Sequence, residues 1–284
     1  MSGEPSVVVE PIGWPVTAQG SSRPNVNPLR MVTSSAAGQI WRHCDDRPLP
    51  QIVIYPRNQG PHCDFKRDTK DRVRVGLKTA LNLYAQQAYQ FAHEFCHVIA
   101  NHSRENQRHD AEHANHWIEE CFCEAASLFA LRRMAEEWPQ HKSFWSWTTA
   151  AGEKFAPELH AYAQKQIEKA LLRLPLDQDF LGWLESREQF MRDHPVAIEK
   201  DEKTKVALRE DYTVIASRLL PLLEANPENW EAISYLNLPP PRDNKSLADH
   251  LADWKTACPE RFRPFIGKLE RLFLPPAIEA AGGG

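Results

Sequence analysis

The segment Tyr84–Asn101, YAQQAYQFAHEFCHVIAN, carries the strongest pattern in this 284-residue chain. Its apolar residues recur at three- and four-residue steps without a proline or glycine, which predicts an amphipathic helix. Positions four residues apart share a helix face, so His93 and His97 would project together beside the buried stripe. Glu94 would point towards the same space. The HEFCH stretch therefore indicates two ligands for a zinc ion and a carboxylate that can act on its bound water.

A third metal ligand is expected from a second helix, because a catalytic zinc ion usually has three protein ligands and one open position for water. Trp117–Ala130 is amphipathic and carries Glu119, Glu120 and Glu124. The expected buried stripe of this helix consists of Ile118, Phe122, Ala125 and Phe129. Periodicity alone leaves each of the three carboxylates open as a ligand. An acidic first turn that complements the helix dipole would explain one or two of them equally well.

An HExxH helix followed by a glutamate on a second helix resembles the gluzincins, a group of zinc metallopeptidases. The stretch Trp117–Phe122, WIEECF, is similar to the Trp-x-x-Glu-x-Phe segment of their aminopeptidase branch. This resemblance implies Glu120 as the third ligand, and it implies that Glu124 accepts a hydrogen bond from a zinc-binding histidine. Glu119 and Glu124 remain alternative ligands.

A fainter resemblance links the chain to the cytoplasmic regulatory metallopeptidases that cleave repressors. It depends on Phe91–His97 and Glu124–Ala130, and it covers roughly residues 50–131. Metzincins fit less well, because Ser103 occupies the position of their third histidine.

Two segments before the HEFCH stretch predict strands. Gln51–Tyr55 is rich in β-branched residues and lies between two prolines, which is typical of a buried strand. Asp71–Leu77 alternates charged and apolar residues, which favours a strand with one exposed face. Arg72–Gly76 is the expected edge strand, along which an extended peptide could bind through main-chain hydrogen bonds.

These patterns predict an α+β fold with a zincin-like catalytic core, made of a small mixed sheet and the metal-binding helices, and a mainly helical C-terminal lobe. We expect an extended or disordered N-terminal arm at 1–30, the core at 31–135, the lobe at 136–275 and a flexible tail at 276–284. Helical patterns in the lobe cover residues 161–174, 180–192, 204–223, 230–236, 246–257 and 261–273. The tryptophans expected in its core are Trp145, Trp147, Trp183, Trp230 and Trp254.

Composition favours a cytoplasmic globular enzyme. The formal net charge is −4 and no long basic run occurs, so nucleic acid is not an expected partner. No apolar run approaches the roughly 20 residues that span a bilayer, and the N-terminus has no signal-peptide core, so no membrane association is expected. The expected partner is a peptide or protein substrate, and the oligomeric state stays open.

Other histidines and cysteines offer further ligand candidates. His109, His113 and His116 have helical spacing, but their polar surroundings favour a solvated connector over a second metal site. The six cysteines form no CxxC pair, which favours buried thiols, with Cys96 and Cys123 as minor alternative zinc ligands.

The sequence thus predicts a zinc metallopeptidase that binds one zinc ion per chain through His93, His97 and Glu120. Glu94 would be the general base and acid, and Glu124 would orient a histidine. Donors for the oxyanion could come from His160, Tyr162, Tyr212 or Tyr235. The alternatives are a zincin-fold regulatory or interaction module with little or no hydrolysis, and a zinc hydrolase that acts on a non-peptide bond.

Overall fold

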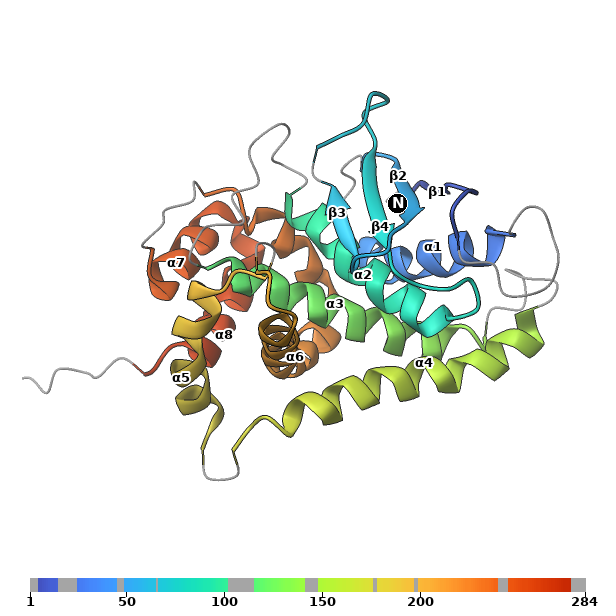
Figure 1. Cartoon of the computed structure of the whole chain (residues 1–284). Coiled ribbons are helices and arrows are strands. Elements are labelled where there is room, and N and C mark those ends of the chain that lie inside the picture. Colours follow the sequence, from blue (N-terminus) through green and yellow to red (C-terminus); the bar gives the residue numbers. More distant parts are fainter. Residues whose placement is uncertain are drawn as a thin grey trace, which may run out of the picture.

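The architecture is mixed, with a small sheet lying over a set of helices (Figure 1). A computed structural model describes residues 5–14, 25–44, 49–64, 66–101, 115–140, 148–175, 178–196, 199–239 and 245–276. Within these residues the sheet has four strands and most of the remaining chain is helical. The α+β prediction is confirmed.

The sheet orders its strands as β1 (Val7–Val9), β2 (Ile52–Pro56), β4 (Val73–Leu77) and β3 (His62–Asp64). β1 and β4 run parallel to β2, whereas β3 is antiparallel to β4. The predicted strands correspond to β2 and β4. The prediction that Arg72–Gly76 forms the edge strand was wrong, because β4 pairs on both sides and β3 forms the edge.

The described residues 5–14 and 25–30 of the expected N-terminal arm are part of the fold. Val7–Val9 pairs with β2, and α1 begins at Asn27 and continues to Trp41, so the expected boundary at residue 30 falls inside a helix. Pro28 lies in the first turn of α1, where its missing N–H costs nothing. Trp14 is buried against the same core. A strand of three residues shows too little alternation to be recognised in the sequence.

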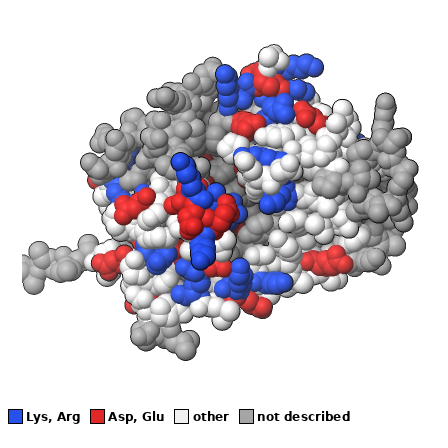
Figure 2. Space-filling view, viewed as in Figure 1, with Lys and Arg blue, Asp and Glu red and all other residues white. Residues whose placement is uncertain are grey.

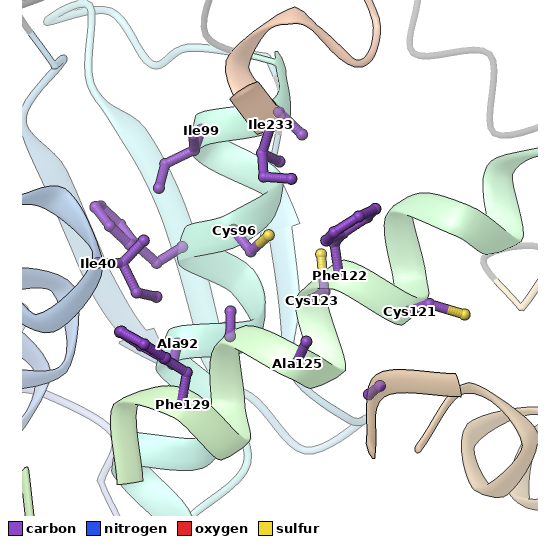
Figure 3. Packing of buried hydrophobic residues seen from close by; sticks show 14 of the residues in the cluster. Ile40, Ala92, Cys96, Ile99, Cys121, Phe122, Cys123, Ala125, Phe129 and Ile233 are labelled. Carbon is purple, nitrogen blue, oxygen red and sulfur yellow. The ribbon is translucent and has the colours of Figure 1, made fainter. Parts of the chain in front are cut away.

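Helix α2 (Tyr84–Asn101) matches its predicted range, and α3 (His116–Glu137) is longer than predicted. The prediction of one buried stripe on α3 was wrong, because every side chain from His116 to Leu131 is buried. The reason is that α1, α2, α4 and α6 all pack against this central helix. Small side chains at the α2–α3 contact, among them Ala92, Cys96 and Ala125, leave little separation between the two helices (Figure 3).

The C-terminal half is helical, as predicted. Its elements are α4 (Thr148–Leu171), α5 (Phe180–Asp193), α6 (Glu202–Ala225), η1 (Pro227–Tyr235), α7 (Leu247–Ala257), η2 (Glu260–Phe262) and α8 (Arg263–Phe273). Trp183, Trp230 and Trp254 are buried as expected, whereas Trp145 and Trp147 lie outside the described residues. The expected tail also lies outside them, apart from residue 276.

Three of these helices begin at a side chain that caps their first backbone N–H groups. Asp179 accepts a hydrogen bond from the N–H of Gly182, Asp201 from that of Thr204, and Ser246 starts α7 in the same way. Such caps satisfy donors that have no partner inside the helix. They explain why the helices start where they do.

Charged side chains gather at the turn between β3 and β4, at the top of the view in Figure 2. Arg67 pairs with Asp71 at 2.8 Å, and Arg72 pairs with Asp68 at 2.6 Å. The charges of this turn therefore compensate one another. In the part of the chain that the structure describes, no helix combines the length and apolarity that a membrane span requires.

Asp211 on α6 ties the C-terminal helices together. Its carboxylate is fully buried and accepts hydrogen bonds from Arg173, which follows α4, at 2.9 Å and from Arg187 on α5 at 2.6 Å. A buried carboxylate needs such partners because burial removes its hydration.

We expect Asp211→Ala to lower the free energy of unfolding by about 1–3 kcal/mol, because three hydrogen bonds from two guanidinium groups are lost while both groups keep access to water. Denaturant unfolding followed by circular dichroism measures the change. The control Glu136→Ala removes an exposed partner of Arg133 and is expected to cost less than about 0.5 kcal/mol. Equal effects of the two substitutions would contradict the assignment.

Candidate metal centre

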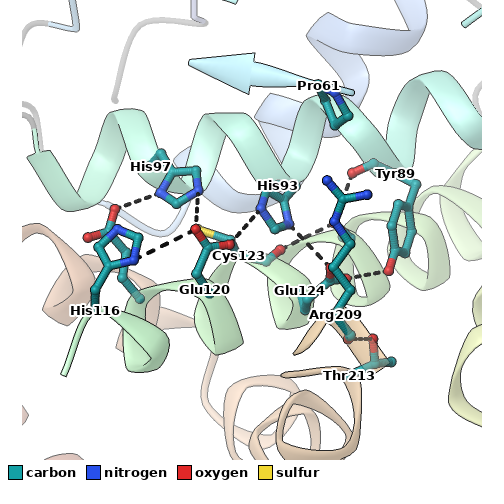
Figure 4. Close-up of polar contacts among 12 residues, drawn as sticks. Pro61, Tyr89, His93, His97, His116, Glu120, Cys123, Glu124, Arg209 and Thr213 are labelled. Atoms are coloured by element: carbon teal, nitrogen blue, oxygen red, sulfur yellow. Dashed lines mark hydrogen bonds and ion pairs between the residues drawn. The ribbon is translucent and has the colours of Figure 1, made fainter. Parts of the chain in front are cut away.

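The candidate site lies where α2 and α3 face each other below β3 (Figure 4). Helix α2 contributes His93, Glu94 and His97 from consecutive turns. Helix α3 contributes its acidic residues and Cys123. A rigid pair of packed helices fixes the positions of these side chains better than loops would.

The Nε2 atoms of both histidines converge on one carboxylate, that of Glu120. The Nε2 atom of His93 lies 3.2 Å from Oε2, and the Nε2 atom of His97 lies 3.6 Å from Oε1. Imidazole nitrogens and carboxylate oxygens are common ligands of divalent ions in hydrolytic sites. The structure therefore brings together the three residues that the sequence proposed as a ligand set.

The charges in this cluster depend strongly on one another. Burial acts to raise the pKa of Glu120, but the charges of His97 and His93 outweigh burial and lower it to about 2. Burial acts to lower the pKa of His97, but Glu120 and Glu119 raise it to about 10. Positive charge is thus favoured beside Glu120. A divalent cation would supply this positive charge while both imidazoles stay neutral.

The Nδ1 atoms of the two histidines face different carboxylates. His97 Nδ1 lies 2.6 Å from Glu119 Oε1, and His93 Nδ1 lies 3.7 Å from Glu124 Oε1. A carboxylate that accepts the Nδ1–H bond favours the tautomer in which Nε2 is free to bind a metal ion. The geometry thus gives the three glutamates of α3 different partners, a distinction that helical periodicity could not make.

A thiol also belongs to the cluster. Ligand atoms of His93, His97 and Cys123 lie within 4.8 Å of one another, so this buried group could hold a metal ion. Burial raises the pKa of the Cys123 thiol well above its usual value, and a hydrogen bond with Cys96 raises it further. Only the thiolate is a good ligand. Glu120, by contrast, is ionised.

Glu94 is almost completely buried, with 3% of its surface exposed. Burial raises the pKa of its carboxyl group, and the charges of His93 and His97 oppose this rise. A carboxylate whose pKa is raised towards neutrality is a better proton acceptor than an exposed one. The environment of Glu94 therefore suits a general base.

His116 was assigned to a solvated connector, and this prediction was wrong. It is the first residue of α3, is buried, and its ring stacks on that of His97 with 6.4 Å between centroids. Its Nδ1 atom lies 3.9 Å from Glu120. The i,i+4 spacing of His116 and Glu120 was the signal that could have revealed this contact. His109 and His113 lie outside the described residues.

Two residues outside the cluster form hydrogen bonds with Glu124 and Glu119, the carboxylates that face the histidine Nδ1 atoms. The hydroxyl of Tyr89 donates a hydrogen bond to Glu124 (Figure 4). The amide of Asn237, which follows η1, donates a hydrogen bond of 2.6 Å to Glu119. Asn237 is 118 positions from Glu119, so no local pattern in the sequence could connect the two.

The four candidate oxyanion donors occupy different environments. Tyr162 packs on Tyr89 at 5.5 Å between centroids, and burial and the charge of Glu124 raise its pKa. Burial and the charge of Glu120 raise the pKa of Tyr212. Carboxylates of the cluster thus act on Tyr162 and Tyr212. His160, by contrast, is exposed, and Tyr235 packs against Phe262.

Comparison with protein-family models, curated proteins and solved structures finds no match to this chain.

We expect Asn237→Ala to weaken metal binding by roughly 10- to 100-fold, because Glu119 loses the hydrogen bond that fixes its orientation towards His97. Competition with a chromogenic chelator measures the affinity. The neighbouring variant Leu238→Ala, which removes a half-exposed side chain, serves as the control. If both variants bind metal as the wild type does, Asn237 has no influence on the centre.

Proposed function

We propose that this chain is a zinc-dependent metallopeptidase in which His93, His97 and Glu120 bind the zinc ion. The observation that carries the proposal is the arrangement around the two histidines. Both Nε2 atoms converge on Glu120, while each Nδ1 atom faces another carboxylate. Two oriented imidazoles and one carboxylate form a common ligand set of catalytic zinc, which leaves a position for water.

Glu120 is a better third ligand than Cys123. Its carboxylate lies within 3.6 Å of both Nε2 atoms and is already ionised, because the neighbouring histidines lower its pKa to about 2. Cys123 would first have to lose a proton in a site where burial raises its pKa.

The chemistry follows from the side chains around this position. Zinc supplies a Lewis acid that activates water and polarises the scissile carbonyl. Glu94 accepts the proton of the attacking water and later delivers it to the departing amine. Glu119 and Glu124 keep the Nδ1 protons on His97 and His93, so both imidazoles stay oriented through the reaction.

A peptide is the favoured substrate because a sheet edge lies beside the cluster. β3 pairs with β4 on one side only among the described strands. Burial raises the pKa of Cys63 in β3, and the charges of Glu94 and Glu119 contribute to this rise. β3 therefore runs close to the candidate base, where an extended peptide can pair with its main chain.

Purified wild-type protein is expected to hold one zinc ion per chain, and Cys123→Ser is expected to retain it. His93→Ala and Glu120→Gln should lose most of it, because each removes a ligand. Elemental analysis after dialysis against zinc measures the content. Loss in Cys123→Ser together with retention in Glu120→Gln would make the thiolate the third ligand.

Glu94→Gln is expected to lower kcat/KM for an unstructured protein substrate by roughly 10²- to 10⁴-fold while zinc stays bound, because only proton transfer is lost. Cleavage is followed by mass spectrometry. The control is Glu158→Gln, which makes the same change at an exposed position on α4. If wild type and Glu94→Gln leave the substrate equally intact, the binding-module alternative is favoured over the peptidase.

A further inference from the structure

Arg209 on α6 extends towards the His93 end of the cluster and lies between Glu124 and Pro61 in Figure 4. Its Nη2 atom is 3.4 Å from the point where a β-carbon on Gly60 would stand. The side chain thus reaches from α6 to the segment that leads into β3.

The charge of Arg209 acts on the candidate catalytic carboxylates. Burial raises the pKa of Glu94 and that of Glu124, and the guanidinium opposes both rises. Arg209 is also exposed. A cation with these properties beside a hydrolytic centre is available to an anionic group that enters from solvent.

The direction of β3 tells which part of a substrate would meet this cation. β3 starts at His62, directly after Pro61, and runs to Asp64. In Figure 4 its starting end lies on the side of His93 and Arg209. A peptide that pairs antiparallel with β3, the commoner arrangement of neighbouring strands, would place its C-terminal side at the Pro61 end. Arg209 would therefore meet the residues that follow the scissile bond.

We propose that Arg209 determines specificity by binding a carboxylate on the C-terminal side of the scissile bond. This inference rests on the proposed peptidase function. The carboxylate is either the free C-terminus of a peptide or the side chain of an aspartate or glutamate. A guanidinium presents two parallel N–H donors that match both oxygens of a carboxylate, which adds geometric selectivity to the charge attraction.

The test uses three peptides with the same residues around the scissile bond. The first ends in alanine with a free carboxylate, the second is its C-terminal amide, and the third is an amide with glutamate in place of that alanine. We expect zinc-loaded wild type to favour at least one carboxylate-bearing peptide over the neutral amide by roughly 10- to 100-fold in kcat/KM. In Arg209→Gln this ratio should fall to about one, and Arg209→Lys should keep part of it. The control is Lys203→Gln, at an exposed position of the same helix, which should keep the wild-type ratio.

A binding measurement gives a readout that does not depend on turnover. Zinc-loaded Glu94→Gln should bind the preferred carboxylate-bearing peptide more tightly than the neutral amide, and the double variant with Arg209→Gln should bind both equally. Preference for the free C-terminus identifies the α-carboxylate, and preference for the glutamate peptide identifies the side chain. Cleavage of all three peptides at equal rates by wild type would overturn the role of Arg209 and leave the peptidase standing. Absence of both cleavage and binding would overturn both proposals.

Discussion

The fold has to compensate the acidic side chains that it buries between α2 and α3. Four carboxylates, those of Glu94, Glu119, Glu120 and Glu124, lie within the fold and are each at most 6% exposed. Removing ionised groups from water is expensive unless they are paired, so a fold that buries four of them must provide compensating charge or hydrogen bonds. Two histidines of α2 and the partners of Glu119 and Glu124 supply part of this compensation. A divalent cation at the Nε2 atoms would supply more.

The C-terminal helices are part of this arrangement because they surround α3 and contribute to the site. Asn237 follows η1 and reaches Glu119, whereas Arg209 comes from α6. Asp211, two positions after Arg209, links α6 to Arg173 and Arg187. The hydrogen bonds of Asp211 therefore also fix the turn of α6 that carries Arg209. The division into a catalytic core and a helical lobe describes the order of elements along the chain, but one buried cluster runs through both.

The sequence predicted those features that local periodicity encodes. Tyr84–Asn101 was recognised with its ends because its apolar stripe is unbroken. β2 was recognised from its β-branched residues, and β4 from its alternation of charged and apolar residues. Strands of three residues, such as β1 and β3, carry too little pattern, and strand order depends on pairing between distant segments. The different partners of the three glutamates on α3 depend on the rotation of that helix against α2. No periodicity could determine it on a helix that is buried on all sides.

X-ray absorption at the zinc edge, on zinc-loaded protein, identifies the atoms that bind the metal and so distinguishes Glu120 from Cys123 as the third ligand. We expect nitrogen and oxygen neighbours at about 2.0–2.1 Å, with multiple scattering from two imidazoles and no sulfur shell. A sulfur neighbour at about 2.3 Å would replace Glu120 by Cys123 as a ligand. A spectrum without imidazole scattering would show that His93 and His97 do not hold the metal, and would contradict a zinc site between α2 and α3.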